Sequence, residues 1–234
     1  MIVLVFFITV AIFLACLTIL VIMYTDKPLR AIVMDVYMEG RNVTSKCRIV
    51  QGVVQTGDKL VVLPIGDDAV VSHMEHHGNT GDENRTKIGM AGDTVDLILT
   101  GIDVTRVTTG CILSHPHFTL RPPVRKKMQA KILVMEQLQV PIIRGAQVLL
   151  HMHSIDVPAV ISKLIAITKR DGSIQKSNPR VVTGGTSATV EITLQEKICL
   201  ERLADCRALR RFVLRRGGDS VAVGIIEAVF SAYD

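Results

Sequence analysis

The chain has 234 residues, a hydrophobic content of 48% and a formal charge of +5, with a pI of about 9.0. It contains no G-x-x-x-x-G-K-[ST] motif, which excludes a nucleotide site built on that phosphate-binding loop. Its five cysteines are scattered and lack C-x-x-C spacing, which excludes a disulfide framework and a zinc site of that type and favours small buried thiols.

The first 25 residues are strongly apolar. From Ile2 to Met23 no side chain is charged, and about 20 such residues can cross a bilayer as a helix. Lys27 and Arg30 follow the segment and no basic residue precedes it, so a membrane anchor would leave the rest of the chain in the cytosol. Only a few residues separate the segment from the first expected strand. An incorrectly predicted first exon is therefore the other interpretation of residues 1–25, and both stay open.

Residues 26–118 have the pattern of a small all-β domain. Short β-rich runs, such as residues 29–37, 59–64 and 69–74, alternate with turns that contain Gly, Asp and Pro. In the run 94–99, Val95, Leu97 and Leu99 alternate with Thr94, Asp96 and Ile98, as in a strand with one buried face. We therefore predict an antiparallel β-barrel here, and no long helix.

Residues 119–127 are expected to connect this barrel to a second one. The segment contains two adjacent prolines followed by Arg125, Lys126 and Lys127, so it predicts a stiff, basic linker. A second antiparallel barrel is expected over residues 128–234. Residues 158–167 fit either a helical turn or a strand, and we favour the strand. The fold class is thus all-β: two tandem barrels preceded by an apolar segment that resembles a transmembrane helix.

The histidines, the possible nucleophiles and the clustered arginines of the chain indicate binding and not catalysis. The seven histidines lack the cysteine or carboxylate ligands that would complete a tetrahedral metal site, so they are expected at the surface or in packing. No nucleophile and base form a recognisable pair. The basic cluster near the C-terminus fits either a solvated strand edge or a surface for carboxylates or phosphates; it comprises Arg207, Arg210, Arg211, Arg215 and Arg216.

Several short sequence motifs, in their order along the chain, resemble those of the two C-terminal domains of the elongation factor 1-alpha-like translational GTPases. In the first barrel these are residues 27–30, 35–37, 55–58 and 91–93. In the second barrel they are residues 211–215 and 221–226. Within that family the HBS-one-like ribosome-rescue branch is the most similar, on residues 101–103, 110–112, 140–142, 148–151, 158–161 and 216–218. The resemblance covers essentially everything after Asp26.

The resemblance implies that the first barrel faces the small ribosomal subunit and that the second holds a tRNA-shaped partner, which in the rescue branch is Pelota. The expected partner-binding residues are Arg211, Phe212, Arg215 and Arg216, and Arg125, Lys126 and Lys127 are expected to contact ribosomal RNA. Arg210 departs from the family, which usually has glycine there.

Because the GTPase motifs are missing, we expect no enzymatic activity and no bound cofactor; GTP would bind only if a separate G domain is supplied. We expect a cytoplasmic protein, anchored to a membrane if the apolar segment is genuine. Three alternatives remain open. One is a module that binds tRNA or a release factor, as in elongation factor 1-alpha or the termination factor. Another is a membrane-tethered adaptor, and the third is a nonfunctional fragment whose barrels fold but do not act.

Overall fold

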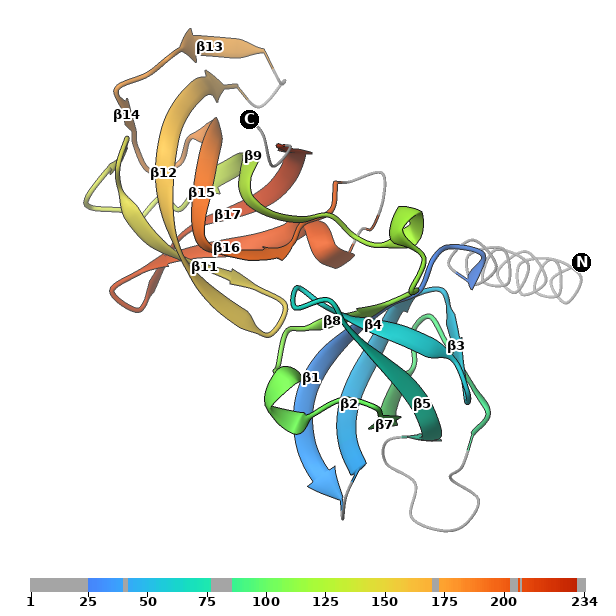
Figure 1. Cartoon of the computed structure of the whole chain (residues 1–234). Coiled ribbons are helices and arrows are strands. Elements are labelled where there is room, and N and C mark those ends of the chain that lie inside the picture. The colour runs from blue at the N-terminus through green and yellow to red at the C-terminus, as the bar shows by residue number, and fades with distance from the viewer. Residues whose placement is uncertain are drawn as a thin grey trace, which may run out of the picture. The chain divides into compact units, whose positions relative to one another are not determined.

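The computed structural model describes residues 25–39, 42–76, 86–169, 173–202, 206 and 208–230 (Figure 1). The chain divides into two compact units, residues 1–121 and 122–234. Both units are built from β-strands, which confirms the all-β fold class. Ile2 and Met23, the expected limits of a membrane span, lie outside the described residues. Among the residues that are described, no helix is long and apolar enough to cross a bilayer.

The first unit is a closed barrel of six strands in the order β1-β2-β7-β5-β4-β8, with β8 pairing back onto β1. The strands are β1 (Arg30–Glu39), β2 (Asn42–Gln51), β4 (Lys59–Leu63), β5 (Asp67–His76), β7 (Thr94–Thr100) and β8 (Ile112–Ser114). A separate ribbon pairs β3 (Val53–Gln55) with β6 (Ile88–Met90). The described part of this unit also contains the short 3-10 helices η2 (Val104–Arg106) and η3 (Phe118–Leu120).

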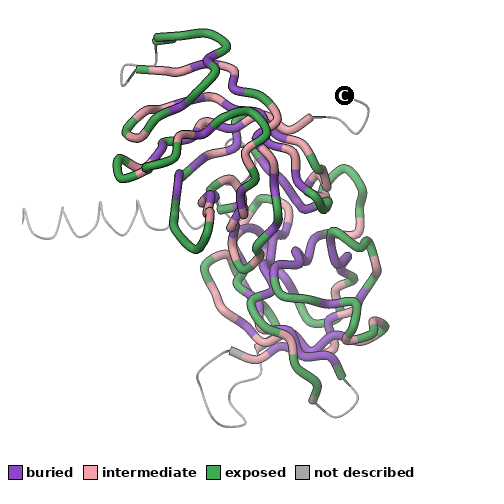
Figure 2. Tube along the Cα trace, turned by 90° about the vertical axis from the view of Figure 1, so that its left-hand side faces the viewer, coloured by how far each residue is buried: buried purple, intermediate pink, exposed green. Residues whose placement is uncertain are grey.

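Alternation along the strands builds the core of the first barrel. In β7, Val95, Leu97 and Leu99 are buried in the interior, as the sequence predicts, and Thr94 and Asp96 on the other face are only partly buried. Ile98 on that other face is nevertheless buried as well. Side chains of all six strands fill the space between them, because successive residues of a strand point to opposite sides. Figure 2 shows these buried positions as purple stretches along the strands. Four of the five cysteines are described, and all four are buried thiols, as expected.

The second unit is also a closed six-stranded barrel. Its strands run in the order β11-β16-β17-β9-β15-β12, and the pairing of β11 with β12 closes the ring. They are β9 (Val124–Val134), β11 (Gln147–Met152), β12 (Ile155–Thr168), β15 (Ser187–Cys199), β16 (Arg211–Arg216) and β17 (Asp219–Val229). Strand β13 (Ile174–Ser177) extends the sheet beside β12, and β10 (Ile142–Ile143) pairs with β14 (Val181–Val182) in a separate ribbon. The 3-10 helix η4 (Ala208–Arg210) precedes β16.

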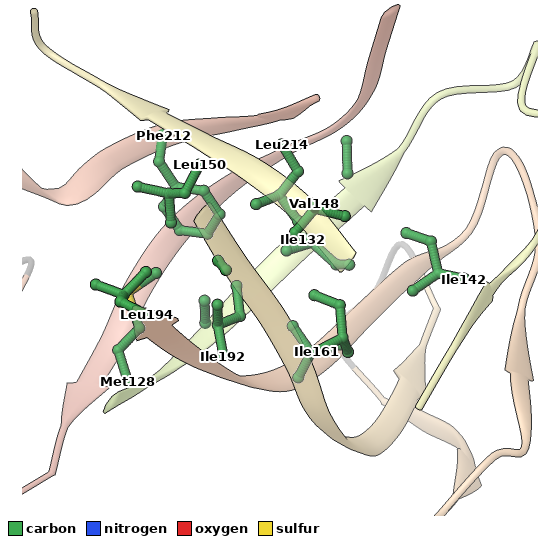
Figure 3. Close-up of a cluster of buried hydrophobic side chains, with 14 of the residues drawn as sticks. Met128, Ile132, Ile142, Val148, Leu150, Ile161, Ile192, Leu194, Phe212 and Leu214 are labelled. Carbon is green, nitrogen blue, oxygen red and sulfur yellow. The ribbon is translucent and has the colours of Figure 1, made fainter. Parts of the chain in front are cut away.

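Branched and aromatic side chains fill the second barrel. Figure 3 shows part of this cluster, in which Phe212, Leu150 and Ile132 come from three different strands. Residues 158–167, which fit either a helical turn or a strand, lie within β12, so the favoured prediction of a strand is confirmed.

The connector is shorter than the sequence suggests. The division between the two units falls at residues 121 and 122, inside the predicted linker 119–127. Residues 124–127, however, are already the start of β9. They are not an extended linker because their backbone pairs with β15: Val124 lies opposite Cys199, and Lys127 lies opposite Thr193.

Candidate partner-binding surface

An open groove of about 530 Å³ lies on the outer face of the second barrel. Strands β16, β17 and β9 form its floor, and residues of β11 and β15 border it. The inward side chains of these strands belong to the core, so the outward positions of the same strands make the groove. The groove is therefore held on paired strands and not on loops.

The register of the strands places apolar side chains in one row across the floor. Val213 of β16 lies opposite Val223 of β17, and Val223 lies opposite Leu133 of β9. His151 extends the row on the β11 side and Ser187 extends it on the β15 side. Leu133 is 52% exposed and Val223 is 37% exposed. A row of exposed apolar side chains on a rigid sheet is typical of a surface that a protein partner covers.

The neighbouring row carries the positive charge of the groove. Ile225 of β17 lies between Arg211 of β16 and Lys131 of β9 in the register of the three strands. Within the part of the chain that the structure describes, neither Arg211 nor Lys131 forms an ion pair. Both cations can therefore meet carboxylates of a partner that covers the apolar row.

Two histidines border the groove, one beside a carboxylate and one largely buried. The Nδ1 atom of His151 lies 2.7 Å from Oδ1 of Asp156, on the paired strand β12. His153 lies in the turn after β11 with φ of 53°, a left-handed conformation that is uncommon for this residue type. Burial, with a smaller effect from the charge of His151, lowers the pKa of His153 to about 4. His153 is therefore neutral near pH 7 and adds no charge to the groove.

Of the four predicted partner-binding residues, Arg211 lies on the rim of the groove. Phe212 is 3% exposed and points into the barrel, so it supports the surface from beneath. Arg215 donates from Nη2 to the carbonyl oxygen of Gly218, 3.0 Å away, within the β16–β17 hairpin. Arg216 borders a second cavity, of about 830 Å³, with residues 135–140 and 219–221. The structure thus does not gather the arginines into one cluster.

The three residues predicted to contact RNA lie at the start of β9. Lys126 is exposed, and the Arg125 guanidinium donates to the carbonyl oxygen of Val124. Lys127 is 3.4 Å from a carboxylate oxygen of Glu191, and its ammonium lies 5.1 Å from the centre of the Phe230 ring. These contacts hold Lys127 within the barrel surface. The RNA contact therefore stays a prediction, and it concerns Lys126 above all.

Glu191 is a nearly buried carboxylate on the outer face of β15. Burial alone would raise its pKa, but hydrogen bonds from Ser162 and Lys127 and the charges of Lys127 and Lys163 outweigh that effect, so the pKa is lowered. Its distance to the Lys163 ammonium is 3.5 Å. This cluster is a structural network that ties β15 to β9 and β12.

In the described ranges, no group of three or more His, Cys, Asp or Glu side chains is arranged to hold a metal ion. The residues that sequence reasoning missed are Lys131, Leu133, Val213, Val223 and Ile225. Each is an outward position of a strand of the second barrel, so the alternation of side chains along these strands contained the signal. The pairing of β17 with β9, which brings these positions together, could not be deduced from the alternation.

The comparisons with known proteins agree with this architecture. Residues 127–227, almost the whole second barrel, match the family described as GTP-eEF1A C-terminal domain-like. The second barrel is thus similar to this domain family over nearly its whole length. Protein HBS1 of Drosophila melanogaster is 36% identical over 206 residues, which cover 87% of this chain and 30% of that protein. Elongation factor 1-alpha of Metallosphaera sedula is 30% identical over 209 residues, which cover 87% of this chain and 46% of that protein.

Both barrels are therefore related to the elongation factor 1-alpha-like translational GTPases, as the sequence phrases suggested. The crystal structure of Sup35 complexed with GDP matches the fold with a TM-score of 0.81 at 22% identity, covering 89% of this chain and 49% of that one. The chain thus spans less than half the length of these relatives. The part that it shares with them is the pair of barrels.

Proposed function

We propose that this chain is a translation-factor module that positions a tRNA-shaped protein partner of the Pelota kind on the ribosome during ribosome rescue. The groove on the second barrel is the binding surface for that partner. The single observation that carries the proposal is the apolar row Val213, Val223 and Leu133 beside the cations Arg211 and Lys131, which form no ion pair with any described residue. The similarity to protein HBS1 supports the choice of the rescue branch.

The first barrel would face the small ribosomal subunit, in line with what the resemblance implies. The chain itself is proposed to be non-enzymatic, because its sequence contains no phosphate-binding loop motif. Its role is then to bind and to orient, and any GTP-dependent step would belong to a different polypeptide segment. We also propose that it acts in the cytoplasm, where ribosomes translate.

The similarity to elongation factor 1-alpha, which also covers 87% of this chain, favours a second candidate. In that case the groove would hold aminoacyl-tRNA or a release factor in place of a Pelota-like protein. Parallel titrations of the chain with the three ligands distinguish these candidates, because the preferred ligand should bind at least tenfold more tightly than the other two.

Titration calorimetry of the full-length chain against a Pelota-like protein tests the proposal. Val223→Asp puts a carboxylate at the centre of the apolar row, where a bound partner would remove it from water. We expect the affinity to fall at least tenfold, since desolvation of an unpaired charge is costly. Ile174→Asp is the matched control, because Ile174 is also an exposed strand residue of this barrel, at 64% exposure, but lies outside the groove. Equal affinities of both folded variants and the unmodified chain would refute the proposal.

A further inference from the structure

A second surface of the same barrel has features of an interface and shares no residue with the groove. It is centred on the two-stranded β10–β14 ribbon, of which β14 is labelled in Figure 1. One face of the ribbon is completely buried, with Ile142 and Val182 at 0% exposure. The other face presents Ile143 and Val181, a cross-strand pair that is 50% and 40% exposed. The ribbon is thus anchored on its inner side and apolar on its outer side.

An arginine follows this apolar pair on one strand of the ribbon. Arg144 occupies the corner of a tight turn in which the Ala146 amide donates to the Ile143 carbonyl, 3.1 Å away. Gly145 supplies the positive φ, 84°, that the turn needs. The backbone of Arg144 is therefore fixed while its side chain is exposed to solvent.

A second arginine precedes the apolar pair on the other strand. Arg180 is exposed and follows the buried Pro179, and the amide of Asn178 donates to the Ile165 carbonyl, 2.8 Å away. Arg144 directly follows Ile143 and Arg180 directly precedes Val181, so the two arginines flank the apolar pair at the same end of the ribbon. Among the described residues neither arginine forms an ion pair. Two like charges at one end of a short ribbon repel each other, so this pair favours an anionic partner.

The loop beside the ribbon adds another apolar side chain, and the end of β16 adds a third arginine. Val140 is 63% exposed, and Nη1 of Arg216 lies 3.5 Å from its carbonyl oxygen at the border of the cavity of about 830 Å³. A Cβ on Gly184 would come within 2.7 Å of the Glu136 carbonyl oxygen, so the turn after β14 packs closely on this loop. Ribbon and loop therefore form one fixed surface, the β10–β14 surface, made of Val140, Ile143, Arg144, Arg180, Val181 and Arg216.

We propose that the β10–β14 surface binds an acidic segment of a protein, in which carboxylates flank an apolar side chain. The carboxylates would pair with Arg144 and Arg180, since guanidinium groups bind carboxylates through two parallel hydrogen bonds. The apolar side chain would cover Ile143 and Val181. RNA phosphates would also meet the arginines, but they leave the exposed apolar pair uncovered, so the observations favour a protein segment. This surface is independent of the groove and does not require the proposed partner.

Fluorescence anisotropy with the full-length chain tests this inference. The probe is a fluorescein-labelled synthetic peptide in which Asp and Glu flank Leu and Phe. Its twin carries Lys in place of every acidic residue, and a third probe is an unstructured single-stranded RNA. We expect the acidic peptide to bind and the Lys twin not to bind. Binding of the twin with equal affinity would overturn the inference.

Variants then place the peptide on the surface. Arg144→Glu with Arg180→Glu should weaken binding of the acidic peptide at least tenfold, and Ile143→Ser should weaken it about threefold or more. The matched control is Lys59→Glu with Lys176→Glu, which makes the same change in net charge at two exposed lysines and should alter the affinity less than twofold. An unchanged affinity in the arginine variant, or an effect no larger than in the control, would refute the site. An unchanged affinity of the Ile143→Ser variant for the acidic peptide would refute the apolar contact. If the chain binds the RNA more tightly than the acidic peptide, and the arginine variant abolishes that RNA binding, the surface belongs to nucleic acid and the inference is wrong.

Discussion

The ring of Phe212 occupies the space that a side chain at position 224 would need. Phe212 of β16 and Gly224 of β17 lie opposite each other in the register of the two strands. A Cβ placed on Gly224 would be 2.6 Å from Cε2 of the Phe212 ring and 3.0 Å from Cε1. The aromatic side chain therefore packs directly over the glycine backbone, beneath the apolar row of the groove.

Gly224→Ala should destabilise the second barrel, because the added methyl group overlaps the ring in a densely packed core. Overpacking of this kind costs roughly 1–3 kcal/mol. Chemical denaturation of the variant measures the cost. The same substitution in a Phe212→Leu background should cost less, since the smaller side chain leaves room; an equal cost in both backgrounds would show that the ring is not the cause.

Phe212→Ala should destabilise the barrel by roughly 3–5 kcal/mol, the usual cost of removing a buried phenylalanine side chain. Because the residue lies in the core and not on the groove, the loss should appear in thermal melts before any partner is added. A variant that melts like the unmodified chain but binds the partner more weakly would instead make Phe212 a direct contact residue.

His153 should make stability depend on pH. Its pKa is about 4 in the folded chain and about 6.5 in an unfolded chain, so the unfolded state binds more protons between these values. The free energy of unfolding should therefore fall as the pH drops from 6.5 to 4, by at most about 3 kcal/mol. His153→Asn, which tolerates the left-handed backbone, should flatten this dependence in denaturation curves measured across that range.

The matched variant is His151→Gln. Because burial is the larger cause of the low pKa of His153 and His151 the smaller one, this variant should retain most of the pH dependence. If His153→Asn and the unmodified chain lose stability equally between pH 6.5 and 4, the assignment to His153 is wrong.

The chain should not bind GTP. No part of its sequence has the phosphate-binding loop motif, so a labelled GTP analogue should show no saturable fluorescence change with micromolar protein. Saturable binding that unlabelled GTP displaces would contradict this expectation.

The sequence was most informative where one strand could be read alone. The alternation in residues 94–99 predicted that Val95, Leu97 and Leu99 share a buried face, although Ile98 on the other face is also buried. The phrases 211–215 and 221–226 resembled the family whose model matches the second barrel. The surroundings of the clustered arginines were less predictable. Arg215 donates a hydrogen bond to a carbonyl oxygen of its own hairpin, and Arg216 donates one to a carbonyl oxygen of a nearby loop. Lys127 likewise pairs with Glu191, more than sixty positions further along the chain. Such partners depend on strand register, which short-range patterns do not determine.

Cross-saturation NMR on the methyl-labelled full-length chain, bound to an unlabelled Pelota-like protein, tests the central claim most directly. The methyl groups of Leu133, Val213, Val223 and Ile225 should lose the most intensity when the partner is irradiated, because they floor the groove. Those of Ile174, exposed on β13, should be unaffected. Saturation that spares these four residues and reaches methyl groups elsewhere on the chain would contradict the groove as the partner-binding surface.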